Sequence, residues 1–428
     1  MKILWITSRL LPDACRKMGW REDVVGGWMQ AQLTALLRTY GDAHEYLILA
    51  SDSRKCDVQL GNVRHRSFGY GKATYGNQVP TKVEEEAKSI IAGFKPDIIH
   101  IHGTEFFYGR MRKMTYCDAP TIVSLQGIIN GLYMHVNGEL SQDELYWYQF
   151  NLRRVLMGSS VFREQQHWRK KRIIQERLVF EMHNHFMGRT DWDRAWTRAL
   201  STAARYYHVN ETLRDVFYGD IRWNRMNIRP HSIYCSAATG YPLKGVHILF
   251  KAVACLKDKY PDISVRVCAA EKLVRKSSLV SFLKAEQYNS YLRHLIRKMG
   301  VERHVVGLPR LSALDVADEL LKAELFVLPS FCENSPNSLG EAQLIGTPSI
   351  ATFVGGIPSI LRDGLDGRFV PSGDPATLAE MIDWYFSNPE KVDAYANSAR
   401  MVAQVRHDPT RNAKATIAAY EKVIADAI

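Results

Sequence analysis

Two glutamates separated by seven residues are the feature of this sequence that most directly suggests chemistry. Glu333 follows the segment 329–332, and Glu341 comes eight positions later, with Asn, Ser, Pro and Gly between them. These intervening residues favour a loop that becomes a helix near Asn337 or Ser338. The amides of a first helical turn, with the helix dipole behind them, bind anions. A diphosphate bound there would bring one carboxylate near each end of the ligand, where it can bind sugar hydroxyls, unless Glu341 only complements the dipole.

The elements that must position these carboxylates are predicted to be those of parallel α/β sheets. Short apolar runs alternate with amphipathic stretches, which is typical of βαβ units with helices on both faces of the sheet. The strands are predicted at 3–6, 46–50, 97–102, 121–125, 185–188, 231–235, 263–267, 324–328 and 349–351. One long helix is predicted over 244–260 and another over about 410–428.

Two doubly wound domains are predicted from this pattern. The first spans 1–229 and carries a polar, helical insertion near 139–182, where the strand–helix alternation stops. The second spans 230–408, because the best boundary lies at Pro230. Residues 409–428 form a C-terminal helix. Thr190 is predicted to cap a helix together with Asp193.

The segment around the two glutamates resembles a known family. The pair Glu333-x7-Glu341 after a Leu-Pro-Ser strand end looks like the signature of retaining glycosyltransferases of family four, which have the B-type fold of two facing Rossmann-like domains. Similar motifs follow the family's order at 346–348, 355–358, 363–367 and 370–375, with a Lys-Gly pair upstream at 244–245. In the first half, the glycines 26–27 and the run 100–103 resemble its glycine loop and strand-end histidine motif.

The resemblance implies roles for individual residues. Lys244 would neutralise the donor diphosphate, Glu341 would bind the ribose and Glu333 the transferred sugar. The implied catalytic residues are Glu333, Lys244 and His102. The implied donor-binding residues are Gly26, Gly27, Lys244, Thr239, Asn337, Ser338, Leu339 and Glu341. Candidates on the acceptor side are Glu105, Gln126, Arg169, Lys170, Lys171 and Arg172.

Two positions depart from the family pattern. Thr239 stands where the family usually has an arginine as a second cation for the diphosphate, and Gln126 stands where it often has a histidine near the transferred sugar. The missing cation could come from Arg310 or Arg9, or activity could be low.

No metal or other cofactor is expected. His100 and His102 project to one face of a strand and could be ligands, but no third ligand is evident. Asp191 and Asp193 resemble a metal-binding Asp-x-Asp motif, yet their place at a helix start favours capping. His183 and His185 are interpreted as structural.

A basic stretch accounts for much of the charge. The chain of 428 residues has a net charge of +11, and the segment 163–177 holds six cations and two acids. This stretch is either a solvated helix face or a contact for an acceptor or an anionic membrane surface, with Trp168 at the interface. Nucleic acid is not an expected partner, because no recognised binding module is present.

Localisation is predicted from what the sequence lacks. Seven cysteines without a CxxC pair match neither a disulfide framework nor a zinc ribbon. No apolar run is long enough to span a membrane or to act as a secretory signal. A cytoplasmic protein is therefore expected, with peripheral binding to the inner face of the membrane through the basic stretch.

The resemblance, taken with these observations, implies a retaining, metal-independent hexosyltransferase. It would move a sugar from a nucleotide-diphosphate sugar to a hydroxyl of a glycan or lipid-linked acceptor, in cell-surface polysaccharide or glycolipid synthesis. The alternatives are a nucleotide-sugar epimerase or hydrolase of the same fold, which needs no acceptor, and a degenerate protein that binds nucleotide sugars without turnover.

Overall fold

The computed structural model describes residues 1–22, 26–69, 81–110, 118–149, 167–236, 241–274 and 287–427. The chain divides into two compact units, and each is described by itself. Unit 1 consists of Met1–Gly131, His167–Asp215 and Arg406–Ile428; unit 2 consists of Leu132–Gln166 and Val216–Val405. None of the described helices is long and apolar enough to cross a membrane.

The described part of unit 1 is built on an eight-stranded sheet with the order β3-β4-β2-β1-β5-β6-β7-β8. Neighbouring strands are parallel except β3, which pairs antiparallel with β4. The central strands β5 and β6 are buried at every position, as expected for a sheet covered on both faces. The strands are β1 (Lys2–Thr7), β2 (Glu45–Ala50), β3 (Asp57–Leu60), β4 (Val63–Ser67), β5 (Ile98–His102), β6 (Thr121–Ser124), β7 (His185–Gly188) and β8 (Arg205–His208).

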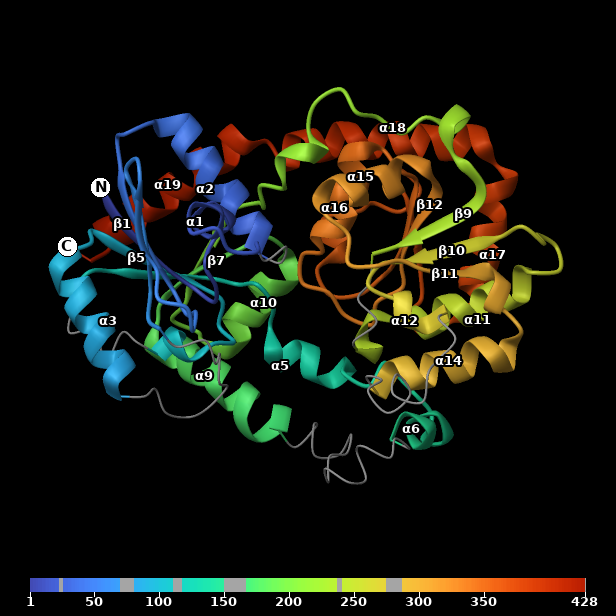
Figure 1. Ribbon diagram of the computed structural model, residues 1–428, viewed down its shortest axis with the longest axis horizontal. Coiled ribbons are helices and arrows are strands. Elements are labelled where there is room, and N and C mark those ends of the chain that lie inside the picture. The colour runs from blue at the N-terminus through green and yellow to red at the C-terminus, as the bar shows by residue number, and fades with distance from the viewer. Residues whose placement is uncertain are drawn as a thin grey trace. The chain divides into compact units, whose positions relative to one another are not determined.

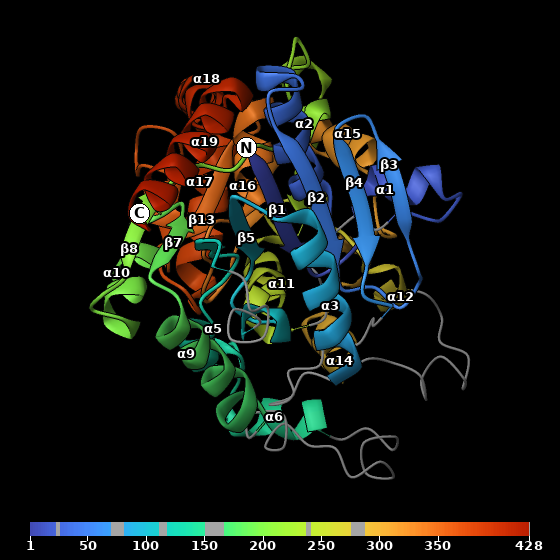
Figure 2. The ribbon, with the colours of Figure 1, turned by 90° about the vertical axis from the view of Figure 1, so that its left-hand side faces the viewer.

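Helices cover both faces of this sheet (Figure 1). The last helix α19 lies beside α2 on one face, although they stand at opposite ends of the sequence (Figure 2). On the other face, α3 and α9 pack against the same strands. The helices are α1 (Pro12–Lys17), α2 (Gly27–Tyr40), α3 (Thr81–Phe94), α5 (Ile129–Leu132), α9 (Ile173–Met182), α10 (Asp191–Leu200) and α19 (Pro409–Ala425).

The described part of unit 2 contains a six-stranded parallel sheet with the order β11-β10-β9-β12-β13-β14. Numbered within the unit, this is the 3-2-1-4-5-6 order of the Rossmann fold. The strands are β9 (Arg229–Cys235), β10 (Ser264–Val267), β11 (Val305–Gly307), β12 (Ala323–Leu328), β13 (Ser349–Thr352) and β14 (Arg368–Val370).

Helices also lie on both sides of the unit 2 sheet. Helices α15 and α16 lie on one side, and α11 and α14 lie on the other, where they share one hydrophobic core with the strands (Figure 1). The helices are α6 (Gln142–Gln149), α11 (Val246–Leu256), α12 (Glu271–Val274), α14 (Gln287–Met299), α15 (Ala313–Lys322), α16 (Asn337–Ile345), α17 (Pro375–Ser387) and α18 (Pro389–Arg406).

The predicted fold class is confirmed, but the predicted course of the chain needs correction. The segment near 139–182 is not one insertion in the N-terminal domain: its first part, including α6, belongs to unit 2, and α9 belongs to unit 1. The physical reason is that Leu140 is buried in the unit 2 core, whereas Val179 and Phe180 are buried in unit 1. Residues 216–229 also belong to unit 2 rather than to the first domain.

Candidate active site

The unit 2 site forms where the strand order reverses. Strands β9 and β12 are neighbours, but the chain continues from them to opposite sides of the sheet. Ligands of open α/β sheets bind in the crevice outside the carboxyl ends of the strands at such a point. The loops that follow β9 and β12 therefore carry the first candidates for a ligand site.

Lys244 and Glu333 come from these two loops and form an ion pair. Lys244 Nζ donates to Glu333 Oε1 at 2.7 Å, and Ser330 Oγ donates to the same oxygen at 2.7 Å. The lysine side chain remains 33% exposed and the glutamate side chain 10%. The resemblance assigned the two residues separate roles, but in the structure their side chains are paired. A bound anion would therefore compete with Glu333 for the ammonium group of Lys244.

Lys244 ends a short 3-10 turn, Pro242–Lys244, rather than lying in a helix that starts at 244. Gly245 follows with φ +68°, and α11 starts only at Val246. The predicted helix over 244–260 is therefore too long at both ends, because a residue in the left-handed conformation separates the turn from the helix. A Cβ at Gly245 would lie 1.8 Å from the carbonyl oxygen of Pro329, so the two loops touch backbone to backbone.

Helix α16 begins at Asn337, as predicted, and no side chain caps its N-terminus. The amides of Leu339 and Gly340 donate hydrogen bonds to the carbonyl of Pro336. Glu341 lies inside this helix and is only 6% exposed. The loop after β13 supports the loop that carries Glu333, because the amide of Gly356 donates to the carbonyl of Glu333 at 2.9 Å. Glu333, Asn337, Ser338, Leu339 and Glu341 thus occupy one loop–helix segment at the carboxyl edge of the sheet.

Cys332 stands beside this carboxylate but cannot serve as a nucleophile near neutral pH. Burial, together with the charge of Glu333, raises the pKa of the thiol to about 12. The thiol therefore stays protonated, and only a thiolate is nucleophilic.

Thr239, which stands where the family usually has a second cation, lies outside the described residues. Arg310, a candidate for the missing cation, is exposed after β11.

In unit 1, the start of α2 brings the glycines of the predicted loop together with two arginines. Gly26 precedes the helix and Gly27 is its first residue, with no side chain capping this end. A Cβ at Gly26 would lie 3.4 Å from Cδ of Arg9, and one at Gly27 would lie 3.1 Å from Cδ of Arg214. Two arginine side chains thus lie beside the start of α2, and the sequence did not point to Arg214.

His100 and His102 are both fully buried on β5, and they have different partners. His100 contacts Tyr420 Oη at 2.6 Å through Nδ1 and Ser124 Oγ at 2.5 Å through Nε2. His102 has no hydrogen-bond partner on either ring nitrogen among the described residues, and its ring packs on Trp5 with centroids 4.6 Å apart. Burial, with charges from His100 and Arg189, lowers the pKa of His102 well below its usual range, so the ring is neutral.

Glu105 and Gln126 follow β5 and β6 at the carboxyl edge of the unit 1 sheet. The buried atoms Glu105 Oε2 and Gln126 Nε2 have no hydrogen-bond partner in the described part of the chain. Nearby Glu176 accepts four hydrogen bonds from Thr104, Ile129 and Asn130. Desolvation, reinforced by Glu176, raises the pKa of Glu105 to about 7.

The raised pKa of Glu105 predicts how stability depends on pH. A carboxyl group whose pKa rises on folding favours the native state below its unfolded value and loses that contribution as it ionises. The contribution of Glu105 to stability should therefore fall between pH 4.5 and about 7. We expect Glu105→Gln to flatten this fall in urea denaturation series, whereas Glu181→Gln at an exposed position of α9 should leave it unchanged. Identical slopes for wild type and Glu105→Gln would contradict this role of Glu105.

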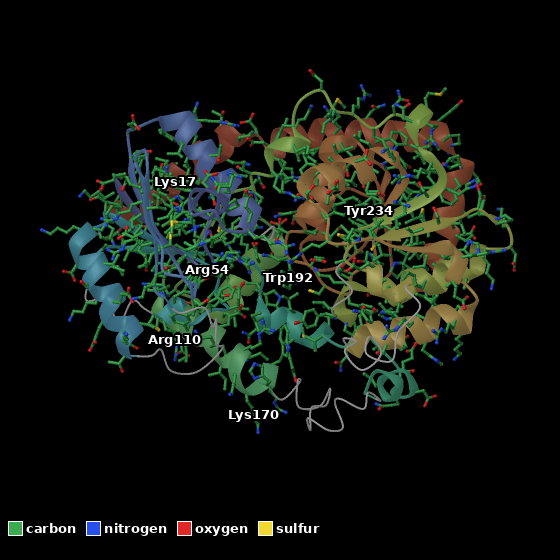
Figure 3. The ribbon with its side chains drawn as sticks, in the orientation of Figure 1. Lys17, Arg54, Arg110, Lys170, Trp192 and Tyr234 are labelled. Carbon is green, nitrogen blue, oxygen red and sulfur yellow. The ribbon has the colours of Figure 1, made fainter. Side chains whose placement is uncertain are left out.

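The basic stretch is an exposed surface of unit 1 over its described part. Arg169, Lys170 and Lys171 are exposed, and Lys170 lies at the outer end of the helical segment leading into α9 (Figure 3). Trp168 does not lie at a surface as predicted: it is 8% exposed, because the Arg172 guanidinium covers its ring at 3.9 Å. Residues 163–166 are outside the described residues.

The described residues contain no group of three or more potential metal ligands. Thr190 and Asp193 form the predicted capping box of α10. The Asp193 carboxylate also accepts a hydrogen bond from Tyr206 Oη at 2.5 Å, so it has a structural role in holding the start of α10. His183 is structural as predicted, because its ring contacts Thr121 Oγ1 and the carbonyl of Gly109.

Comparison with known proteins starts from the fold. Sucrose-phosphate synthase from Thermosynechococcus elongatus superposes with a TM-score of 0.70 at 14% identity, covering 100% of both chains. Anabaena Alr3699/HepE in complex with UDP-glucose gives 0.63 at 14% identity, covering 98% of this chain and 99% of that one. WaaG, a glycosyltransferase involved in lipopolysaccharide biosynthesis, gives 0.61 at 14% identity over 97% and 99%. The fold is therefore that of the B-type glycosyltransferases.

The sequence comparison places the family within unit 2. Residues 227–402 match the model of the family described as glycosyl transferases group 1. The D-inositol 3-phosphate glycosyltransferase of Streptomyces coelicolor is 33% identical over 163 residues, which are 38% of this chain and 34% of the relative. That of an Arthrobacter strain is 30% identical over 38% of this chain and 36% of its own length. The match spans about a third of these relatives.

Proposed function

We propose that the protein is a retaining glycosyltransferase that uses a nucleoside-diphosphate sugar as donor. The observation that carries this proposal is the Lys244–Glu333 pair, which sits at the strand-order reversal of the group 1 glycosyltransferase domain. The uncapped N-terminus of α16 in the same loop supplies amides and a helix dipole for phosphate. One structural relative, Anabaena Alr3699/HepE, was solved in complex with UDP and in complex with UDP-glucose, which makes UDP-sugars the first donors to test.

The reaction proposed for this site needs no strong protein base. The bond between the anomeric carbon and the phosphate oxygen breaks, and the acceptor hydroxyl oxygen bonds to the same carbon on the same face. The acceptor proton passes to the departing phosphate oxygen. The enzyme must then stabilise the negative charge that grows on the phosphate, which is the task of Lys244 and the α16 amides. Glu333 holds Lys244 in place and can accept hydrogen bonds from sugar hydroxyls.

Product analysis with UDP-glucose, other UDP-sugars and a panel of glycan and lipid-linked acceptors tests this function. We expect UDP release that depends on an acceptor and a product with the donor's anomeric configuration. UDP release without acceptor would favour the hydrolase, and an isomerised nucleotide sugar the epimerase. Calorimetric binding of UDP-sugars without turnover on the whole panel would favour a non-catalytic binding protein.

Metal independence follows from the same assignment. Because Lys244 and helix amides are proposed to carry the phosphate charge, we expect full activity after treatment with EDTA. Loss of activity that Mg²⁺ or Mn²⁺ restores would contradict this expectation. Manganese titration of the free protein by calorimetry gives a second reading that does not depend on turnover.

We further propose that the exposed cations Arg169, Lys170 and Lys171 hold the enzyme at an anionic membrane surface that carries a lipid-linked acceptor for polysaccharide or glycolipid synthesis. Each cation near such a surface contributes about 1 kcal/mol, so replacing all three with Gln should weaken vesicle binding about 100-fold. Arg172 is left unchanged because it stacks on Trp168.

Cosedimentation with anionic and neutral vesicles is the measurement. A matched control replaces the exposed lysines Lys17, Lys82 and Lys414 of unit 1 with Gln. We expect binding to anionic vesicles to weaken in the first triple variant and with added salt, and to change little in the control. An equal loss of vesicle binding in both variants, or no vesicle binding by the wild type, would mean that the basic stretch is only a solvated helix face.

A further inference from the structure

Residues 138–145, which we call the strap, belong to unit 2 although they precede the glycosyltransferase domain at 227–402 in the sequence. Residues 140–145 of the strap, its outer part, are held by contacts within unit 2. Leu140 is buried in the unit 2 core. Glu144 accepts hydrogen bonds from Lys251 Nζ and Tyr291 Oη, both at 2.6 Å. These bonds lower the pKa of Glu144 to about 2, so the anchor stays ionised at any neutral pH.

Gly138 and Glu139, the inner part of the strap, lie against loops of the candidate active site. Gly138 has φ +57°, and a Cβ there would lie 2.4 Å from the carbonyl oxygen of Pro242, the first residue of the Lys244 turn. Glu139 reaches the loop after β14, where a Cβ at Gly373 would lie 2.6 Å from Glu139 Oε2. Phe331, in the loop that carries Glu333, lies 3.3 Å from the same point. Gly138 and Glu139 thus meet the loops after β9 and β14, and Phe331 of the loop after β12 approaches the same glycine as Glu139.

His247 connects the strap to these loops. Its Nε2 contacts the carbonyl of Gly138 at 3.0 Å and must donate there, because a carbonyl only accepts. Its Nδ1 is 2.6 Å from Tyr288 Oη, and its ring stacks on Phe331 with centroids 5.5 Å apart and planes 10° from parallel. Burial lowers the pKa of His247 to about 4, so the ring is neutral at neutral pH and Nδ1 can accept from Tyr288 Oη while Nε2 donates to Gly138.

The turn that carries Lys244 depends on such neighbours. A 3-10 turn of three residues has little stability of its own. On one side, the amide of Phe331 donates to the carbonyl of Leu243 at 2.8 Å. On the other side lies Gly138 of the strap. Because His247 touches both Gly138 and Phe331, it fixes the two supports relative to each other.

We propose that the strap is a positioning element of the donor site and that His247 is its positioning residue, holding the Pro242–Gly245 turn so that Lys244 reaches Glu333. The consequence for turnover rests on the proposed function; the consequence for the turn does not. A displacement of about 1 Å in a catalytic group can cost about 100-fold in rate, so a loosened turn should lower turnover markedly.

The test compares His247→Phe, which keeps the stacked ring but loses the donor, with His247→Gln, which keeps a donor. His304→Phe is the matched control, because His304 is equally buried and its Nδ1 bonds the carbonyl of Ile263. Hydrogen exchange of the ligand-free protein, followed by mass spectrometry, reports on the amides of the Lys244 turn and of Phe331. Kinetics with the active donor provide kcat and KM.

We expect His247→Phe to speed exchange in peptides covering 241–246 and 331–334 at least tenfold and to lower kcat at least tenfold, with partial rescue in His247→Gln. His304→Phe should lower thermal stability without either change. Unchanged exchange at the turn in His247→Phe would overturn the proposal, even if the protein proved inactive on every donor. Faster exchange with unchanged kcat would overturn the role in catalysis while leaving the proposed function standing.

Discussion

Replacing Lys244 with methionine should lower turnover at saturating donor by about 100- to 1,000-fold, the range seen when one preorganised donor to a developing negative charge is lost. In the proposed reaction the leaving phosphate gains charge as its bond to the anomeric carbon breaks, so the ammonium group would matter more in the transition state than in the ground state. Methionine keeps most of the volume of the lysine stem and removes the ammonium group, with its charge and its hydrogen bond to Glu333.

The partner of Lys244 complicates a single substitution. Glu333 is buried, and removal of the lysine takes away the cation that pairs with its carboxylate, although the hydrogen bond from Ser330 stays. A buried charge that loses its counterion is costly, and part of any loss could arise from that cost. The double variant Lys244→Met with Glu333→Gln removes both charges and separates the two effects.

Steady-state kinetics decide the assignment. We expect kcat to fall in both the single and the double variant, with donor KM changing less than kcat. If only KM rises, the lysine contributes uniform binding to substrate and transition state, and its proposed role is wrong. If the double variant regains full turnover, the loss in the single variant came from the uncompensated charge of Glu333.

The sequence predicted central strands well and edge strands poorly, for a physical reason. Strands buried on both faces, such as β1, β5 and β12, are almost continuous apolar runs. Strand β4 alternates buried and less buried residues and contains Arg64, His65 and Arg66, and β8 is half exposed along its length. Such strands lie near or at a sheet edge, where polar side chains face water, and their local sequence resembles that of a loop.

The site was predictable where the signal is local and not where it depends on distant contacts. The spacing from Glu333 to Glu341 and the start of α16 at Asn337 could be read from neighbouring residues. The Lys244–Glu333 bond joins residues 89 positions apart, and no sequence pattern specifies it. Ser330 was part of the predicted segment, but its hydrogen bond to Glu333 depends on how the loop folds.

The strap shows the same limit at the level of domains. Its residues were assigned to the first domain because they follow the first-domain strands in sequence. One contact that holds them in unit 2, Glu144 to Lys251, spans 107 positions. His247 was predicted only as part of an amphipathic helix, since its periodicity says nothing about a ring that bonds the carbonyl of Gly138. These are interactions of the folded chain, which single-sequence patterns do not encode.

Gly245→Ala should destabilise unit 2 severely, because the added methyl group meets backbone. Its Cβ would lie 1.8 Å from the carbonyl oxygen of Pro329, an atom that cannot rotate away as a side chain could. The residue also has φ +68°, which costs an L-residue about 1–2 kcal/mol. The two loops must then separate, and with them Lys244 and Glu333. A loss above about 4 kcal/mol is expected from strain of this kind.

Gly364→Ala is the matched control, because it has nearly the same backbone conformation without the crowding. Gly364 has φ +70°, and nothing lies within 4 Å of its added Cβ. It should therefore show only the conformational cost, which corresponds to a fall in Tm of roughly 2–8 °C for a unit of this size. Thermal melts followed by circular dichroism should show a fall of at least about 10 °C for Gly245→Ala, together with lost UDP binding. Equal melting temperatures for the two variants would mean that the loops after β9 and β12 do not need their backbone contact, and the close approach that places Lys244 beside Glu333 would lose its physical basis.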